Sequence, residues 1–279
     1  MTRAVRLPGG KDVPALGQGT WFMGEGRAPA ASEAAALRLG IELGMSLIDT
    51  AEMYADGGAE KVVAEAIAGQ RDQVFLVSKV YPHNASRTGV AKACERSLQR
   101  LKTDRIDLYL LHWRGSVPLG ETVDGFENLV RQGKIGAWGV SNLDESAMAE
   151  LGRVAEGTNC AVDQVLYNPE HRGIEHDLMP WCTDRRIALM AYTPIGQGGQ
   201  LLQAPVLASI AARHGANPAQ IALAWGLRHP NMIVIPKATD PDHVRQNAAA
   251  RDIALTVQDL AEIDAAFPPP RRKQSLAML

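Results

Sequence analysis

The sequence has few cysteines, few aromatic residues and almost no net charge, and each shortage excludes a class of protein. Its 279 residues include three cysteines, 5% aromatic residues and a formal net charge of -2. The cysteines Cys94, Cys160 and Cys182 are too far apart for a CxxC metal or redox pair, and their number suits a reducing cytoplasm better than a disulfide framework. Without a dense basic stripe, the chain offers no electrostatic footprint for nucleic acid or an anionic membrane. We therefore expect a small-molecule partner.

Long apolar runs and nucleotide fingerprints are also missing. No run approaches the roughly 20 residues that a membrane-spanning helix needs, and the N-terminal MTRAVRLPGGKD lacks the apolar centre of a signal peptide. The segment GQGTWF has two glycines of a GxGxxG motif but Phe22 in place of the third, and no GxxxxGK[ST] occurs. We therefore expect a cytoplasmic protein and favour a closed barrel over an open, doubly wound sheet.

The residues that are present predict a barrel of alternating strands and helices. A chain with 46% hydrophobic and 22% charged residues can bury a sizeable core, and its length suits one barrel of about 250 residues. Eight β-like segments alternate with helix-like ones, which is typical of a parallel sheet. They cover residues 14–20, 46–51, 74–80, 106–113, 135–140, 161–167, 187–192 and 232–238. We predict an α/β fold, a (β/α)8 TIM barrel forming a single domain over residues 1–279.

Helices and flanking segments can be assigned in the same way. Apolar spacing predicts helices over 34–43, 62–67, 90–101 and 122–130. Ser32 and Asn217 are expected helix caps, and a final helix should open near Thr256 before a short, basic tail. Residues 5–16 contain a Pro-Gly-Gly turn, which predicts an N-terminal β-hairpin that plugs the bottom of the barrel.

Four polar residues follow three successive predicted strands. Asp49 and Tyr54 come after the second strand, Lys79 ends the third and His112 ends the fourth. The carboxyl ends of barrel strands meet at one mouth, where Lys79 and Asp49 can offset each other's desolvation. An opposite charge within about 4–6 Å typically lowers a pKa by 1–3 units, so we expect Lys79 to lower the pKa of Tyr54. Together with a hydrogen bond from His112, these groups can polarise and protonate a carbonyl.

Each of these residues alone has an ordinary structural explanation. Asp49 can be a strand-end cap, Lys79 a salt-bridge partner, and Tyr54 a packing residue. His112 can be a core histidine. Their occurrence at the same end of three neighbouring strands favours a catalytic function, because four such groups seldom meet by chance.

Six short motifs connect the chain to a known family. They are DTAEMY at 49–54, SKV at 78–80, LHW at 111–113, GVSN at 139–142, AYTPIG at 191–196 and IPKA at 235–238. With these motifs in this order, the sequence resembles the aldo-keto reductases over nearly its whole length and is most similar to bacterial methylglyoxal reductase-like members. The resemblance implies an NAD(P)H-dependent carbonyl reductase, in which the nicotinamide delivers hydride and Tyr54 protonates the oxygen. No metal is expected.

The resemblance also assigns cofactor contacts along the chain. The nicotinamide should meet Ser141, Asn142, Gln164 and Tyr192; the pyrophosphate should meet Thr193, Pro194, Ile195 and Gly196; the 2'-phosphate and adenine should meet Lys237, Ala238, Thr239, Arg245 and Asn247. Many family members carry an arginine where this chain has His243, and an imidazole binds phosphate less well than a bidentate guanidinium. We expect Thr239 and Arg245 to compensate, and therefore predict NADPH, with NADH as the alternative.

The substrate side of the resemblance is less specific. Trp21, Tyr81 and Trp113 match positions that line the family's pocket together with His112, and the segments after the fourth strand and at the C-terminus look short. We expect an open mouth, small aldehydes or 2-oxoaldehydes such as methylglyoxal as substrates, and a monomer. Two other functions stay open at this point: a non-catalytic barrel subunit that senses NADPH, and an aldolase-like enzyme with Lys79 as a Schiff-base nucleophile.

Overall fold

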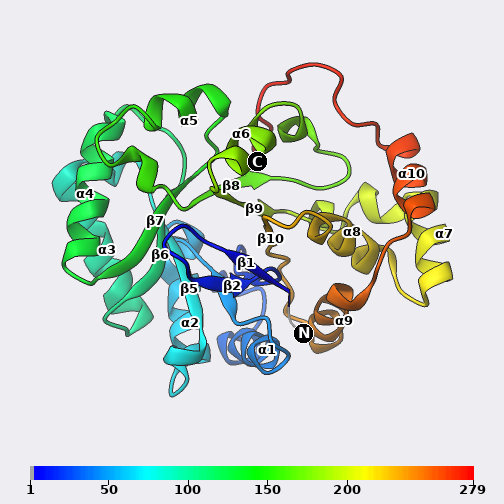
Figure 1. Cartoon of the computed structure of the whole chain (residues 1–279). Coiled ribbons are helices and arrows are strands. Elements are labelled where there is room, and N and C mark those ends of the chain that lie inside the picture. Colours follow the sequence, from blue (N-terminus) through cyan, green and yellow to red (C-terminus); the bar gives the residue numbers. More distant parts are fainter. Residues whose placement is uncertain (1–2) are drawn as a thin grey trace.

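Eight parallel strands form the centre of the protein in a computed structural model that describes residues 3–279 (Figure 1). Each strand pairs with the next along the chain. They are β3 Gln18–Gly19, β4 Leu47–Asp49, β5 Phe75–Val80, β6 Ile106–Leu111, β7 Ile135–Ser141, β8 Val162–Leu166, β9 Ala188–Tyr192 and β10 Met232–Val234. Seven lie within the predicted segments and β7 extends one residue beyond its segment, to Ser141. β5 and β6 are buried along their whole length, as expected of strands covered on both faces.

The sheet closes on itself between its first and last strands. Leu16 forms a parallel bridge with Val234, and the Gly17 N–H donates to the Val234 carbonyl at 2.9 Å. A Cβ at Gly17 would lie 2.6 Å from the Leu47 side chain, so only glycine lets the strands approach this closely. The (β/α)8 prediction is confirmed, and the open doubly wound alternative is wrong.

Helices surround the barrel, and all except α9 and α10, which follow the last strand, connect its strands (Figure 1). They are α1 Ala30–Glu42, α2 Gly58–Ile67, α3 Arg87–Leu101, α4 Leu119–Arg131, α5 Glu145–Leu151, α6 Leu178–Asp184, α7 Pro205–His214, α8 Pro218–Leu227, α9 Pro241–Ala249 and α10 Val257–Ala266. Asn217 and Thr256 cap α8 and α10 through capping boxes, as the sequence predicts. The Ser32 cap is wrong, because α1 begins at Ala30, immediately after Pro29, whose φ of -58° suits the residue before a helix.

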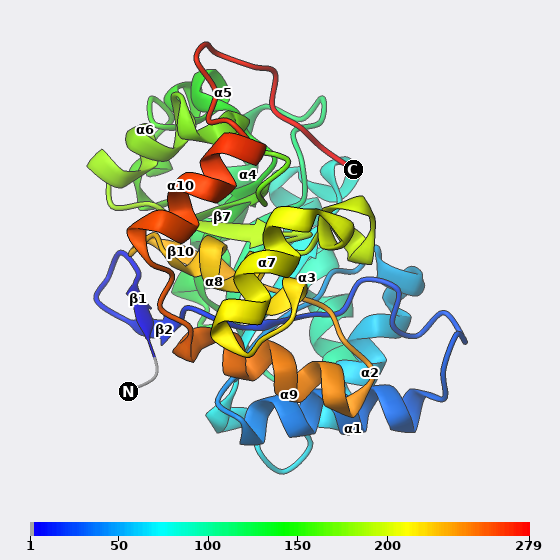
Figure 2. The ribbon, with the colours of Figure 1, turned by 90° about the vertical axis from the view of Figure 1, so that its right-hand side faces the viewer.

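An antiparallel hairpin occupies the end of the barrel opposite the site. It consists of β1 Ala4–Arg6 and β2 Asp12–Pro14, as predicted. Lys11, in its turn, places Nζ 2.8 Å from the Asp107 carboxylate of β6, which fastens the hairpin to the barrel. Figure 2 shows the hairpin at one end of the molecule and the C-terminal tail reaching the other. Within residues 3–279, no helix combines the length and the apolar character needed to cross a bilayer.

Candidate active site

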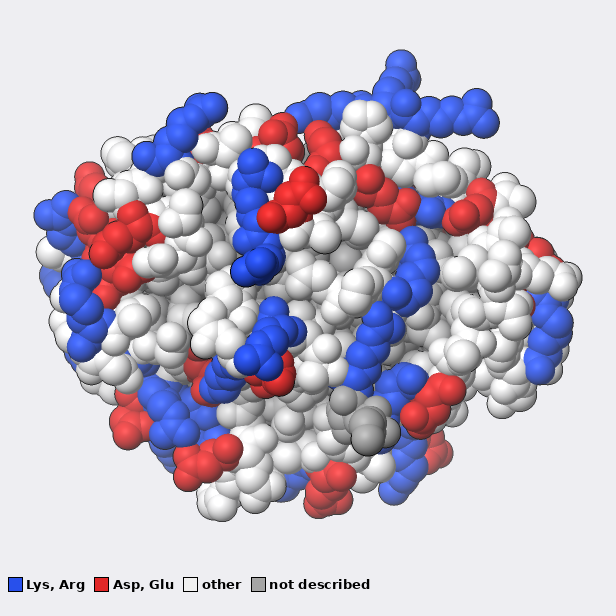
Figure 3. Space-filling view, viewed as in Figure 1, with Lys and Arg blue, Asp and Glu red and all other residues white. Residues whose placement is uncertain are grey.

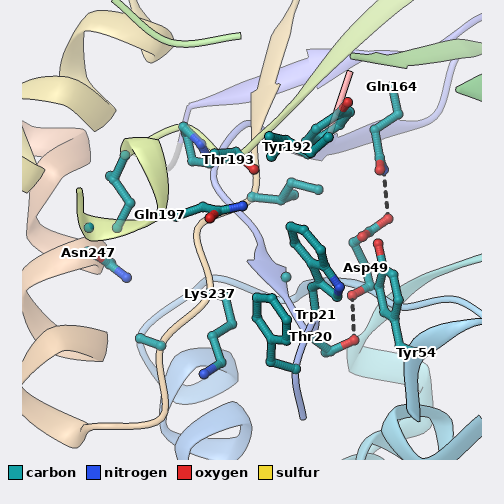
Figure 4. A pocket seen from close by; sticks show the side chains of 18 of the residues that line it. Thr20, Trp21, Asp49, Tyr54, Gln164, Tyr192, Thr193, Gln197, Lys237 and Asn247 are labelled. Atoms are coloured by element: carbon teal, nitrogen blue, oxygen red, sulfur yellow. Dashed lines mark hydrogen bonds between the residues drawn. The ribbon is translucent and has the colours of Figure 1, made fainter. Parts of the chain in front are cut away.

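A pocket of about 1010 Å³ opens at the carboxyl ends of the strands. The loops after β3, β4, β6, β7, β9 and β10 contribute to its lining, together with Gln164 of β8, the start of α8, residues of α9 and the end of the C-terminal tail. Figure 4 shows Tyr54, Asp49 and Gln164 on one side of this pocket and Lys237 and Asn247 on the other. The two ends of the pocket therefore differ chemically. One end holds buried hydrogen-bonding groups, and the other holds a cation.

Asp49, Lys79 and Tyr54 form a buried hydrogen-bonded chain, as the sequence predicts. Lys79 Nζ donates to Asp49 Oδ2 at 2.7 Å and lies 3.2 Å from the Tyr54 hydroxyl. The exposed fraction is 0% for Lys79 and 2% for Asp49. The second carboxylate oxygen of Asp49 accepts from Gln164 Nε2 at 2.7 Å, a contact that the sequence did not indicate. Both oxygens of this buried acid are thereby satisfied.

The pKa of Tyr54 differs from the prediction. Burial raises the pKa of its hydroxyl; Lys79 lowers it, Asp49 raises it, and the net result is an increase. The expected decrease is wrong because desolvation of the phenolate is the largest effect, and together with the repulsion from Asp49 it outweighs the attraction to Lys79. Lys79 itself has a raised pKa, since attraction to Asp49 and Tyr54 outweighs its own burial. At neutral pH the site therefore holds a protonated phenol beside an ammonium group.

His112 is a neutral imidazole in this site. Burial and the nearby Lys79 charge lower its pKa to about 2, so it carries no charge at physiological pH. Its ring meets that of Tyr54 edge-on, with 5.8 Å between the centroids. In the part of the chain that the structure describes, Nδ1 is buried without a hydrogen-bond partner. His112 can therefore act toward a ligand as a hydrogen-bonding group and not as an ion.

A strained turn holds Tyr54 in place. The residues that follow it, Ala55, Asp56 and Gly57, have φ values of 51°, 50° and 80°, all in the left-handed region. A non-glycine residue in this region costs about 1–3 kcal/mol, so its surroundings must fix the turn. At Gly57 the φ of 80° favours glycine, and a Cβ there would also lie 2.4 Å from the side chain of Arg100, which would have to move.

The four predicted nicotinamide contacts, Ser141, Asn142, Gln164 and Tyr192, all line the pocket. Ser141 on β7 pairs in register with Gln164 on β8, and the Ser141 hydroxyl donates to the Gln164 carbonyl at 2.8 Å. The Asn142 side-chain amide donates to the His112 carbonyl at 3.2 Å and accepts from the Tyr192 hydroxyl at 2.9 Å. Burial raises the pKa of Tyr192 to about 12. This network orients an amide and an aromatic ring beside the tetrad of Asp49, Tyr54, Lys79 and His112.

The other predicted cofactor residues divide into two groups. Those that line the pocket are Thr193, Pro194, Ile195, Lys237, Ala238 and Asn247, and those that do not are Gly196, Thr239 and Arg245. The Arg245 side chain is 58% exposed and pairs with Asp242 in its own helix at 3.3 Å. His243, identified from the sequence as the unusual residue, does line the pocket. The structure therefore leaves the phosphate end with fewer cations than the sequence suggested.

The substrate end is more enclosed than expected. Trp21, His112 and Trp113 line it as predicted, whereas the prediction for Tyr81 is wrong: Tyr81 does not line the pocket, and its ring packs edge-on to Trp113 with 5.7 Å between the centroids. The C-terminal tail also reaches the pocket and contributes Met278 and Leu279. The mouth is therefore not left open on the tail side, contrary to the prediction.

Ion pairs hold this tail in place. Lys273 Nζ lies 3.0 Å from Asp177, immediately before α6, and 3.4 Å from Glu145, the first residue of α5. The sequence could not indicate these contacts, because they join residues far apart in the chain and carry no motif. In residues 3–279, no group of three or more His, Cys, Asp or Glu side chains is arranged to hold a metal ion.

The fold and the site place the chain in a known class. It belongs to the aldo/keto reductase family, whose model matches residues 15–267. Methylglyoxal reductase YeaE of Escherichia coli (strain K12) is 51% identical over 281 residues, with 99% of each chain covered. Glyoxal reductase of Bacillus subtilis (strain 168) is 34% identical, covering 94% of this chain and 91% of the relative.

Solved structures agree with this assignment. The aldo-keto reductase from Klebsiella pneumoniae in complex with NADPH superposes with a TM-score of 0.98 at 52% identity, with both chains fully covered. A second structure of an aldo/keto reductase from that organism, in complex with NADP and acetate, gives a TM-score of 0.97. The predicted family and oxidoreductase class are confirmed, and the expected cofactor, NADPH, is one that a close structural neighbour contains.

Proposed function

We propose that this protein reduces small aldehydes, 2-oxoaldehydes among them, with NADPH and with Tyr54 as the general acid. The hydrogen-bonded chain from Gln164 through Asp49 and Lys79 to Tyr54 carries the proposal. Lys79 and Asp49 are buried and paired at the inner end of a large pocket, where a structural salt bridge alone would not require a tyrosine hydroxyl. The names of the curated relatives support the substrate class.

The residues of the pocket fit a nicotinamide dinucleotide. Asn142 and Gln164 offer amide groups at the reaction end, and Tyr192 offers a ring beside them. Lys237 supplies a positive charge at the other end, which suits a phosphate-bearing half. When bound, NADPH would supply the hydride; the residues named here would hold it and exclude water from the reacting end.

Tyr54 would then complete the reduction by proton transfer. Its raised pKa keeps the hydroxyl protonated at neutral pH, so a donor is present before a substrate arrives. As the O–H bond of Tyr54 breaks, the substrate oxygen gains the proton, and the resulting phenolate is stabilised by Lys79 at 3.2 Å. Asp49 keeps Lys79 in position, and neutral His112 can donate a hydrogen bond to the same substrate oxygen. Tyr54 regains its proton from solvent.

The lining favours small, uncharged carbonyls. Trp21, Met53 and Trp113 surround the reaction end with apolar surface, and in the described chain Arg27 and Lys237 are the only lysine or arginine side chains that line the pocket. The Schiff-base alternative is disfavoured because Lys79 is fully buried and its raised pKa keeps it protonated, whereas a nucleophilic amine must be neutral. Cytoplasmic location and a monomeric state stay predictions.

The first experiment is to follow NADPH absorbance with methylglyoxal, glyoxal and a panel of aldehydes. Saturable oxidation of NADPH that requires the aldehyde is expected, with NADH as the weaker cofactor. Tight NADPH binding without turnover of any carbonyl would contradict the proposal and favour the cofactor-sensing alternative.

A further inference from the structure

A loop without any motif brings a second cation to the pocket. Residues 20–29 connect β3 to α1, and Thr20, Trp21, Phe22 and Arg27 from this loop line the pocket. In residues 3–279, Arg27 and Lys237 are the only lining side chains with a permanent positive charge. Figure 2 shows this loop extending to the end of the molecule at which α9 begins. The loop starts beside Lys237, because the Gly19 N–H donates to the Pro236 carbonyl at 2.9 Å and a Cβ at Gly19 would lie 3.9 Å from the Lys237 Cβ.

The Arg27 guanidinium is held against an aromatic platform. Its Cζ lies 4.2 Å from the centre of the Phe22 ring, and Phe22 in turn stacks on Trp21 with centroids 4.4 Å apart and 14° between the planes. Arg27 Nε lies 2.8 Å from the Glu25 carboxylate. Within the described chain, neither terminal nitrogen of Arg27 makes a hydrogen bond to protein, and the side chain is 62% exposed. Two faces of the group are fixed while its outer donors remain available.

The base of this loop is rigid. Met23 is fully buried, and its N–H donates to the Thr20 carbonyl at 2.9 Å. The Gly24 N–H donates to the buried Glu33 carboxylate at 2.8 Å. Gly24 has a φ of 76°, and a Cβ there would lie 2.5 Å from the backbone of Gly58, so the loop packs directly against the start of α2. The platform under Arg27 is therefore preorganised, which lowers the entropy cost of binding a ligand.

A further positive charge at the phosphate end of the pocket would help to bind the phosphates of the cofactor. NADPH carries a pyrophosphate and a 2'-phosphate, whereas the pocket places Lys237 and the imidazole of His243 at that end. Arg245, predicted to compensate for His243, lies outside the lining and pairs with Asp242. We propose that Arg27 is a phosphate-binding residue for the nicotinamide cofactor, supplied by the loop before α1. This inference rests on the proposed function, because it names a further residue of the same cofactor site.

The test measures cofactor affinity and not turnover. Trp21 and Trp113 line the pocket, so quenching of tryptophan fluorescence can report the binding of NADPH and NADH. For Arg27→Gln we expect NADPH to bind about five- to tenfold more weakly, as for loss of a partly exposed charge-assisted contact, with a smaller difference at high salt. Arg6→Gln is the matched control, because Arg6 is exposed, pairs with Asp12 and lies in the hairpin at the other end.

Glu25→Gln separates phosphate binding from a structural role. If Arg27 binds phosphate, removal of the competing carboxylate should strengthen NADPH binding or leave it unchanged. If the Glu25–Arg27 pair only closes the loop, both variants should weaken binding alike, which would overturn the inference. Equal NADPH affinity of the unaltered chain and Arg27→Gln would also overturn it.

The two cofactors identify the phosphate. Weaker binding of both NADPH and NADH to Arg27→Gln assigns Arg27 to the pyrophosphate, whereas weaker binding of NADPH alone assigns it to the 2'-phosphate. Loss of affinity in Arg245→Gln but not in Arg27→Gln would restore the sequence prediction and contradict ours. If the unaltered chain bound neither nucleotide, the proposed function itself would be wrong. If it bound both nucleotides and reduced aldehydes, and Arg27→Gln behaved identically, only the inference about Arg27 would be wrong.

Discussion

The two ends of the pocket are built in different ways. At the reaction end, Asp49 and Lys79 are buried at strand ends and bonded to groups from other strands. At the other end Lys237 lines the pocket, and the two arginines considered as further phosphate contacts, Arg27 and Arg245, are exposed and pair with acids two or three residues away in their own segments. Barrel packing therefore fixes the chemistry at the first end, whereas local loop contacts decide which cations are available at the second.

The largest expected effect separates catalysis from binding at the reaction end. Tyr54→Phe removes the proton donor and keeps the ring, so turnover should fall by roughly 10²–10⁴. The dissociation constant of NADPH should stay within about twofold, because the buried pair beneath Tyr54 is untouched. Steady-state kinetics and fluorescence titration of the same preparation measure both quantities. Undiminished turnover would remove Tyr54 from the role of general acid.

Removal of one member of the buried pair should destabilise the barrel. Lys79→Met leaves the Asp49 carboxylate buried with Gln164 as its remaining side-chain partner, and we expect the free energy of unfolding to fall by about 3–5 kcal/mol. The double variant Asp49→Asn with Lys79→Met should recover part of that loss, because the unpaired charge is gone. Urea denaturation measures both. Lys11→Met is the control, since Lys11 pairs with Asp107 from an exposed position, and an equally large loss there would contradict the comparison.

Acidification should weaken the fold through His112. Its pKa is about 2 in the folded protein and about 6.5 in an unfolded chain. A lowered pKa means that the unfolded chain binds the proton first, so stability is full above pH 6.5 and falls as the pH drops toward 2. Between pH 7 and pH 5 the loss from this group is about 2 kcal/mol.

A variant can assign that loss to His112. In thermal unfolding at several pH values, His112→Asn should show a flatter dependence than the unaltered chain, whereas His83→Asn, at an exposed position, should not. Parallel curves for all three proteins would argue against a buried neutral imidazole.

The smallest effect concerns the phosphate end. Lys237→Ala should weaken NADPH binding about tenfold and NADH binding much less, as expected for loss of one charge-assisted contact to the 2'-phosphate. Titration of both nucleotides provides the measurement. Equal losses would move Lys237 to the pyrophosphate, and an unchanged affinity for both would remove it from the site.

The residues that the sequence predicted best are those whose position depends on strand ends. Apolar runs locate the strands, and a polar residue at the end of such a run lies at the barrel mouth. The sequence could therefore predict that Asp49, Lys79 and His112 lie close together. The direction of the pKa shift of Tyr54 could not be predicted from the sequence. It depends on how far the effect of burial outweighs that of the Lys79 charge, and burial is a property of the folded pocket.

The sequence could not predict contacts between residues far apart in the chain, or the directions of side chains on helix surfaces. Gln164 is 115 residues from Asp49, and no spacing rule connects a residue of β8 to one of β4. The Arg245 side chain is directed by its ion pair with Asp242 in the same helix, α9. The path of the C-terminal tail depends on the ion pairs that Lys273 forms. Such contacts are settled by three-dimensional packing and leave no periodic pattern.

The hydrogen bond that closes the barrel, from the Gly17 N–H to the Val234 carbonyl, has a consequence for how the protein acquires its activity. It joins the first strand of the sheet to the last, so the barrel stays incomplete on the ribosome until the β10 segment has emerged. Contacts of such sequence separation are slow to form, and partly folded chains expose strand edges in the meantime. Lys237, on the segment after β10, lines the pocket and is placed only when this strand closes the barrel, so a nascent chain can complete the pocket only after the β10 segment has been synthesised.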